Sequence, residues 1–170
     1  SWPNSPAETL SLAALPDWQF TPLLVRSLST PAWFTGSDGQ DHLVYELLLT
    51  NALPVPVTIS KVDVMDADTS APLLSLSGEA LLATMSLATA PETPEVVLPP
   101  ASIGVVWLDV PLTSSEDVPG AVTHRLAIMP PPDVEVPEAL LSFTGAEVLV
   151  DSRPPVVLGA PLTGSGWAAL

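Results

Sequence analysis

The sequence contains no cysteine, which excludes disulfide bonds and thiolate metal ligands. Basic residues are almost as scarce, with four lysines and arginines against nineteen aspartates and glutamates and a net charge of −15. A nucleic-acid-binding protein needs clustered cations to displace counterions from phosphates, and an anionic membrane surface attracts the same cations. We therefore expect no nucleic-acid partner.

Long apolar runs are also absent. The longest, Ile103 to Leu108, has the length of a strand, whereas a membrane-spanning helix needs about 20 apolar residues, so no membrane span is expected. The opening Ser1-Trp2-Pro3-Asn4 does not resemble a signal peptide, and we expect an excised segment or a mature chain without its leader. Apolar residues still make up 47% of the chain, enough to form a core without cross-links.

Prolines, in contrast, are abundant: 21 of them divide the 170 residues, and helices tolerate proline only in their first turn. The segments between them alternate between apolar and polar residues, most clearly from Asp41 to Asn51, where Leu43, Tyr45 and Leu47 point to one side. Further strands are expected over Phe20–Leu28, Val55–Asp66, Leu73–Leu76, Val105–Val110, Val122–Met129 and Glu147–Val150. About seven short strands predict an all-β fold, a single antiparallel β-sandwich of the immunoglobulin-like kind.

Two local patterns refine this prediction. The apolar register shifts between Ile59 and Val62, which suggests a β-bulge or an edge strand. The segment from Ser77 to Met85 has a serine at the N-cap position, an acidic first turn and an apolar stripe, and so predicts one short crossover helix. A weaker capping-box pattern, Ser5 to Glu8, could start another turn or two.

The predicted domain organisation has three parts: an N-terminal extension over 1–17, the β-sandwich over 18–153, and a linker over 154–170. The linker is expected because the chain turns to proline, glycine and small residues there. Loops are expected over 35–40, 89–95 and 130–137, the last as extended, polyproline-like chain.

Catalytic groups are few. The two histidines, His42 and His124, both fall inside strand patterns, where a surface or packing role is the usual one. The sequence has no GxSxG elbow and no HExxH motif, so neither a serine nucleophile nor a zinc site is indicated. A glycosidase-like carboxylate pair built on Glu46 or Asp109, with Asp63 as a further candidate, is left as a third hypothesis because such pairs are assembled in space.

One acidic cluster could provide oxygen ligands for Ca²⁺: Asp63, Asp66 and Asp68. An EF-hand loop needs a central glycine and a distal glutamate, and neither is present here. A solvated strand end entering a turn is therefore the favoured interpretation, and no metal or other cofactor is predicted.

The five tryptophans raise the possibility of sugar binding through exposed aromatic faces. Trp33, beside Phe34 and just before a glycine-containing loop, is the best candidate for an exposed platform, although packing at the core or rim is the favoured role. Trp107 lies within an apolar strand and is expected in the core.

Several segments resemble known sequences. The pattern from Val44 to Asn51, followed by Pro56 to Ile59, resembles the start of bacterial exported immunoglobulin-like domains. The stretch from Val156 to Trp167 resembles the segment that leads into the catalytic domain of some bacterial M23-type (lysostaphin-like) metallopeptidase proteins, and His124-Arg125-Leu126 fits their upstream β-sandwich domain. The M23 zinc motifs, HxxxD and HxH, are absent, so no metal ligands carry over.

The resemblance implies an extracytoplasmic, periplasmic or secreted, domain that lies upstream of a peptidase domain. The function expected is a non-catalytic accessory, spacer or interaction domain whose partner is a neighbouring domain of the same polypeptide or a cell-envelope protein or glycan. The alternative is a carbohydrate or cell-wall binding module that uses Trp33 and Phe34.

Overall fold

The computed structural model describes residues 21–87 and 96–156, which form two antiparallel β-sheets packed face to face. Sheet A has the order β1-β3-β8-β6, with β2 beside β3 on the same edge as β1. Its strands are β1 (Leu23–Ser27), β2 (Ala32–Thr35), β3 (Asp41–Asn51), β6 (Met85–Leu87) and β8 (Ile103–Leu112). Sheet B has the order β10-β9-β4-β5, with β7 also on β4. Its strands are β4 (Val57–Asp66), β5 (Pro72–Ser77), β7 (Val97–Leu98), β9 (Ala121–Met129) and β10 (Ser142–Leu149).

This strand order confirms the predicted sandwich. The sequence of strands β1-β3-β8-β6 facing β10-β9-β4-β5 corresponds to the A-B-E-D and G-F-C-C′ sheets of immunoglobulin-like folds. The described residues hold ten strands rather than about seven, because β1 and β2 are two pieces of one edge and β6 and β7 are too short for an alternating pattern to show.

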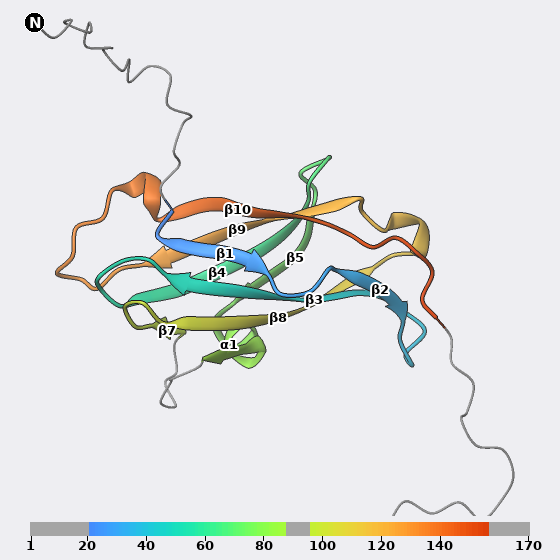
Figure 1. The fold of residues 1–170 in the computed structure, drawn as a ribbon, viewed down its shortest axis with the longest axis horizontal. Helices are drawn as coiled ribbons and strands as arrows, with labels where there is room; N and C mark the ends of the chain where they lie inside the picture. Colours follow the sequence, from blue (N-terminus) through green and yellow to red (C-terminus); the bar gives the residue numbers. More distant parts are fainter. Residues whose placement is uncertain (1–20, 88–95, 157–170) are drawn as a thin grey trace, which may run out of the picture.

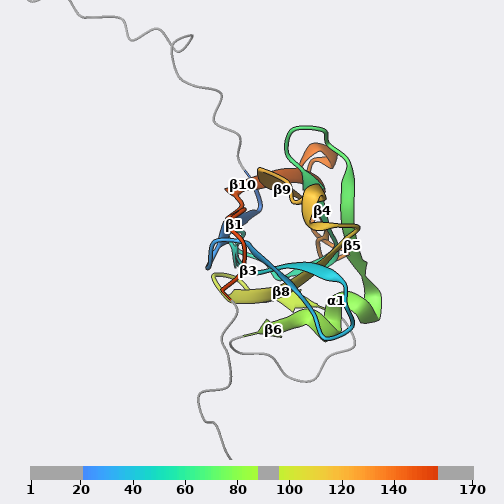
Figure 2. The ribbon, with the colours of Figure 1, turned by 90° about the vertical axis from the view of Figure 1, so that its right-hand side faces the viewer.

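The core lies between the two sheets and is formed by every second residue of the long strands. In β3 the buried positions include Leu43, Tyr45 and Leu47, as the alternation predicted, and β8 contributes Val106, Leu108 and Val110 to the same layer. Sheet B faces them with Val62, Val64, His124, Leu126 and Ile128. Seen end-on in Figure 2, the two layers enclose this core.

Two irregularities shape sheet B. The bulge expected in β4 is confirmed, since the register with β9 shifts between Ile59 and Lys61. Strand β10 starts at Ser142, earlier than the expected Glu147, and carries its own shift between Gly145 and Val148. The bulge hides the first half of β10 from pattern analysis, because it interrupts the alternation of inward and outward residues.

The predicted helix is confirmed as α1 (Gly78–Thr84), which links β5 of sheet B to β6 of sheet A across one side of the sandwich (Figure 2). Leu81 anchors the helix in the core. Ser77 occupies the N-cap position, but its side chain makes no capping hydrogen bond. Gly78 begins the helix with a φ of +54°, a conformation that costs glycine little.

Strand β1 and the end of β10 lie at opposite ends of the sandwich, so the chain enters the fold at one end and leaves at the other (Figure 1). Beyond β10, Asp151 forms a parallel bridge with Ala32, and its amide donates to the Pro31 carbonyl at 2.9 Å. The Trp33 indole N–H donates to the Ser152 carbonyl at 3.3 Å. These bonds attach the last part of the fold to the edge of sheet A.

Some expectations fall outside the described residues: the capping box at 5–8, the loop at 89–95, and residues 157–170 of the predicted linker. None of the described helices is both long enough and apolar enough to cross a bilayer.

Candidate binding surface

The acidic cluster of the β4–β5 hairpin forms a turn rather than a metal site. Asp63 pairs with Lys61 at 2.9 Å, and the Asp66 carboxylate accepts the backbone N–H groups of Asp68 and Thr69 at 2.9 and 2.8 Å. These amide bonds, with that of Thr69 contributing most, lower the pKa of Asp66. Within residues 21–87 and 96–156 no three histidine, cysteine or acidic side chains lie together as ligands for a metal, so Asp63, Asp66 and Asp68 are not brought together as a Ca²⁺ site.

His124 is fully buried and joins the two sheets. Its Nδ1 lies 2.7 Å from the Ala146 carbonyl, which can only accept, so Nδ1 carries the proton. Its Nε2 therefore accepts the Tyr45 hydroxyl at 2.7 Å. Burial lowers the pKa of His124 below its ordinary value, which favours the neutral ring. This histidine therefore has the packing role, one of the two roles, surface or packing, that were expected for it.

His42 lies on the outer face of sheet A between two carboxylates. Its Nδ1 is 2.7 Å from Asp109 and its Nε2 is 3.2 Å from Asp38, while the Phe34 ring stacks on it with centroids 5.7 Å apart. The bond to Asp109, more than any other contact, raises the pKa of His42. Acceptors at both nitrogens favour the protonated ring, in which neither nitrogen has a lone pair to act as a general base.

Trp33 and Phe34, the candidates for an exposed aromatic platform, do not form one surface. Successive residues of a strand point to opposite faces, and Trp33 packs half-buried against the core while Phe34 points outward over His42. The two rings cannot stack on the same ligand from these positions.

The expectation that Trp107 is a core residue is wrong. Trp107 is 54% exposed, because Val106 and Leu108 occupy the inward positions of β8 and place Trp107 on the outer face of sheet A. Its indole N–H donates to the Ser86 hydroxyl at 3.3 Å, which orients the ring beside the edge strand β6. The apolar run from Ile103 to Leu108 concealed this alternation, since Val105 is also outward but half-buried.

Trp107 borders a groove of about 630 Å³ that runs over β3. We call this hollow the Trp107 groove; its lining side chains come from the β1–β2 connection, β2, β3, the end of α1 and β8, and include Ser29, Thr30, Ala32, Val44, Glu46, Ala83, Thr84, Trp107 and Asp109. Glu46 lies directly opposite Trp107 in the β3–β8 register, and Asp109 lies two residues farther along β8 on the same face.

Both carboxylates of the groove are held in place. The Ser29 hydroxyl donates to Glu46 Oε2, and Asp109 Oδ1 bonds His42. A glycosidase acid has to stay protonated, which needs burial away from cations. Asp109 has a side chain that is 64% exposed and forms an ion pair with His42, so it is neither buried nor away from a basic group. The structure brings Glu46 and Asp109 into one groove, but without an environment that would make Asp109 a proton donor.

Exposed apolar side chains gather on the same side of the molecule. Of the eight large hydrophobic residues that are exposed in the described part, five lie in sheet A or immediately after β1: Leu24, Leu28, Phe34, Ile103 and Trp107. Leu48 and Val105, half-buried and cross-strand partners, lie among the outward positions between them. We call this surface, together with the Trp107 groove, the outer face of sheet A. A concentration of this kind is typical of interaction surfaces, whereas single exposed hydrophobic residues need no explanation.

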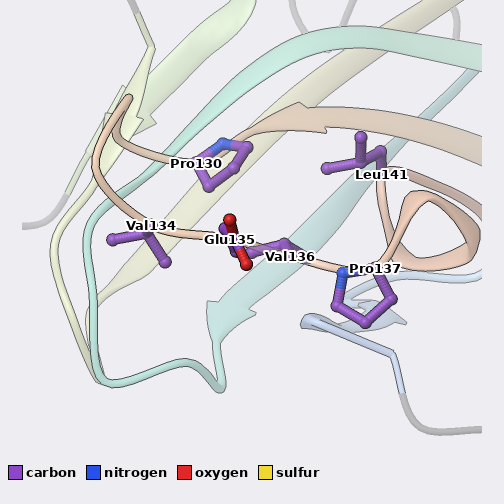
Figure 3. A pocket seen from close by; sticks show the side chains of 6 residues that line it. All are labelled: Pro130, Val134, Glu135, Val136, Pro137 and Leu141. Atoms are coloured by element: carbon purple, nitrogen blue, oxygen red, sulfur yellow. The ribbon is translucent and has the colours of Figure 1, made fainter.

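A second hollow of about 620 Å³ lies within the β9–β10 loop (Figure 3). Its lining consists of Pro130, Val134, Val136, Pro137, Leu141 and one exposed carboxylate, Glu135. It offers a single polar side chain, and the outer face of sheet A has the richer combination of groups.

Comparisons with known proteins add little. No protein-family model matches the sequence, and no curated protein matches it. A protein of known crystal structure from Archaeoglobus fulgidus matches with 19% identity over 75% of this chain and 96% of its own, at a TM-score of 0.32. A likeness this distant carries no functional argument.

Proposed function

We propose that this chain is a non-catalytic interaction domain that binds its partner through the outer face of sheet A. The observation that carries the proposal is the asymmetry between the two sheets: exposed hydrophobic side chains concentrate on sheet A, together with the groove that contains Trp107 and two oriented carboxylates. Sheet B exposes only Met129 and Leu149 of this class among its described strands.

The arrangement of polar groups supports binding over catalysis. The two histidines are committed, one in the core and one between two carboxylates, and neither contacts a serine or threonine hydroxyl in the described hydrogen bonds. Nucleophilic catalysis needs a base that is free to take a proton from a hydroxyl beside it. A preformed sandwich with an apolar outer face serves instead as a rigid support for recognition.

The wider setting of the domain follows from the resemblance and belongs to the same proposal: an extracytoplasmic location, and a place upstream of an M23-type peptidase domain. A reading frame that encodes an export signal before this sequence and HxxxD and HxH motifs after it is the expected result. A reading frame that lacks both would refute the extracytoplasmic location and the place upstream of a peptidase domain. It would not affect the proposal that the outer face of sheet A binds a partner.

Site-specific photo-crosslinking tests the surface itself. A benzoylphenylalanine is placed at Ile103, on the outer face of sheet A, or at Leu149, which is the more exposed residue, at 74%, but lies on β10 of sheet B. In cells that make the protein, we expect crosslinks from position 103 to one partner identified by mass spectrometry, and few from position 149. Equal crosslinking at both positions, or crosslinks from position 149 alone, would refute the proposal.

A further inference from the structure

The side chains that line the Trp107 groove indicate which kind of partner fits it. The inference drawn from them rests on the proposed function above. The groove combines an exposed indole, two carboxylates and apolar walls from Ala32 and Val44. Such a site could in principle hold a sugar, a cationic side chain or an apolar side chain. The hydrogen-bonding capacity of the lining residues distinguishes these ligands.

The groove is rich in acceptors and poor in donors. Most of its donors already have acceptors within the chain. The Trp107 N–H donates to the Ser86 hydroxyl, and the Ser29 hydroxyl donates to Glu46. The Thr84 hydroxyl donates to the Leu81 carbonyl at 3.0 Å. Thr30 has the one lining hydroxyl for which the described residues provide no side-chain hydrogen bond. The groove also has two carboxylates, and each has a second oxygen that makes no hydrogen bond within the described part of the chain.

This imbalance selects for a ligand that only donates. Sugar hydroxyls both donate and accept, so a sugar site is expected to offer donors as well as acceptors. Ammonium and guanidinium groups have donors and no acceptor, and both are attracted to the face of a tryptophan ring. The net charge of −15 adds a long-range attraction for cations and disfavours a second copy of the same chain.

No cation of the described chain fills the groove. Arg26 lies on β1 opposite Leu48, one outward position along β3 from Glu46, and no ion pair joins it to Glu46 in the described structure. His42 neutralises part of the charge of Asp109 but leaves Glu46 without a cationic partner among the described residues.

We infer that the Trp107 groove binds an arginine or lysine side chain of a protein partner. The cation lies between the Trp107 ring and the Glu46 and Asp109 carboxylates, and apolar residues on either side of it pack on Val44, Leu48 and Val105. The partner segment is therefore basic and apolar at once.

The test uses two capped tripeptides of nearly the same shape, one with a cationic and one with a neutral central side chain: valine-arginine-valine and valine-citrulline-valine. Citrulline keeps the planar shape of the arginine side chain, but it is neutral, because a carbonyl oxygen that accepts hydrogen bonds replaces one of the two terminal nitrogens that donate them. Binding to the ¹⁵N-labelled chain is followed through the Trp107 indole resonance and the amides of residues 44–46 and 107–109. We expect saturable shifts with the arginine peptide, weaker binding of the citrulline peptide, and loss of the difference as salt is raised.

Variants localise the effect. Trp107→Ala and Glu46→Gln are each expected to lower the affinity for the arginine peptide by about two- to fivefold. This is the range that one exposed cation–π contact or one surface ion pair contributes. Arg26→Gln should tighten binding, because it removes a like charge. The matched controls are Met129→Ala, at a residue of sheet B that is 51% exposed, and Glu147→Gln on β10, and neither should change the affinity.

Three results would overturn the inference: equal binding of both peptides, no saturable shift with either, or binding of the neutral sugar chitotriose to the same residues in their place. Each of these leaves the crosslinking experiment at Ile103 intact, so the ligand chemistry can fail while the binding surface stands. Dispersed amide spectra establish that each variant is folded before its affinity is compared.

Discussion

Removing the Tyr45 hydroxyl tests whether the buried bridge between the sheets stabilises the fold. In the Tyr45→Phe variant the ring still fills its place in the core, but the buried Nε2 of His124 loses its donor. The cost combines one net hydrogen bond with an acceptor left unpaired away from water, about 2 kcal/mol in total. For a domain of this size that corresponds to a Tm lower by roughly 5–10 °C.

Urea unfolding at pH 8, followed by tryptophan fluorescence, measures this loss. The m-value should stay unchanged, because the variant exposes the same surface on unfolding. A double-mutant cycle with His124→Leu then isolates the pair, and we expect a coupling energy of about 1 kcal/mol or more. A Tyr45→Phe variant as stable as the parent, or a cycle without coupling, would show that the bridge contributes no net stability.

Three further predictions concern the same scaffold. The first uses a His42→Gln background, because the raised pKa of His42 gives a pH dependence of stability opposite in sign to that of His124. In this background the free energy of unfolding should fall as pH drops from about 7 to 5, because His124 in the unfolded chain binds a proton near pH 6.5 whereas the buried ring stays neutral. A flat pH profile would contradict this. Asn51→Ala should cost about 2–4 kcal/mol in denaturant unfolding, since the buried Asn51 amide bonds the carbonyls of Val55, Leu98 and Pro99 and accepts the Leu53 amide. Gly78→Ala should cost about 1 kcal/mol through its positive φ alone, because no atom lies within 4 Å of an added Cβ, and calorimetry would reveal a larger steric effect as an excess loss.

The long strands could be predicted from the sequence because one face of each is buried against the other sheet. In β3 and β9 inward and outward positions alternate clearly along the strand. The bulge after Ile59 could also be predicted, because it moves the apolar residues of the strand from odd-numbered to even-numbered positions.

The binding surface could not be predicted, because its outward residues are apolar as well. In β8, Ile103, Val105 and Trp107 alternate with equally apolar inward residues, and hydropathy alone does not tell the two faces apart. Packing at the core or rim was the favoured role for Trp33, and the pairing of β2 with β3, which sets Trp33 opposite Leu43, turns its ring toward the core. The meeting of Glu46 with Trp107 depends on cross-strand register, which no local pattern contains.

The entry and exit of the chain at opposite ends of the sandwich have a mechanical consequence. A pull on residues 21 and 156 acts along the axes of β1 and β10, which are antiparallel to their neighbours β3 and β9. The hydrogen bonds of each ladder therefore share the load instead of opening one after another. The bridge from Asp151 to Ala32 adds a contact that must shear in the same step. The eleven residues of β3 extend about 35 Å, so the folded domain holds its two ends apart by a fixed length of that order, even under force.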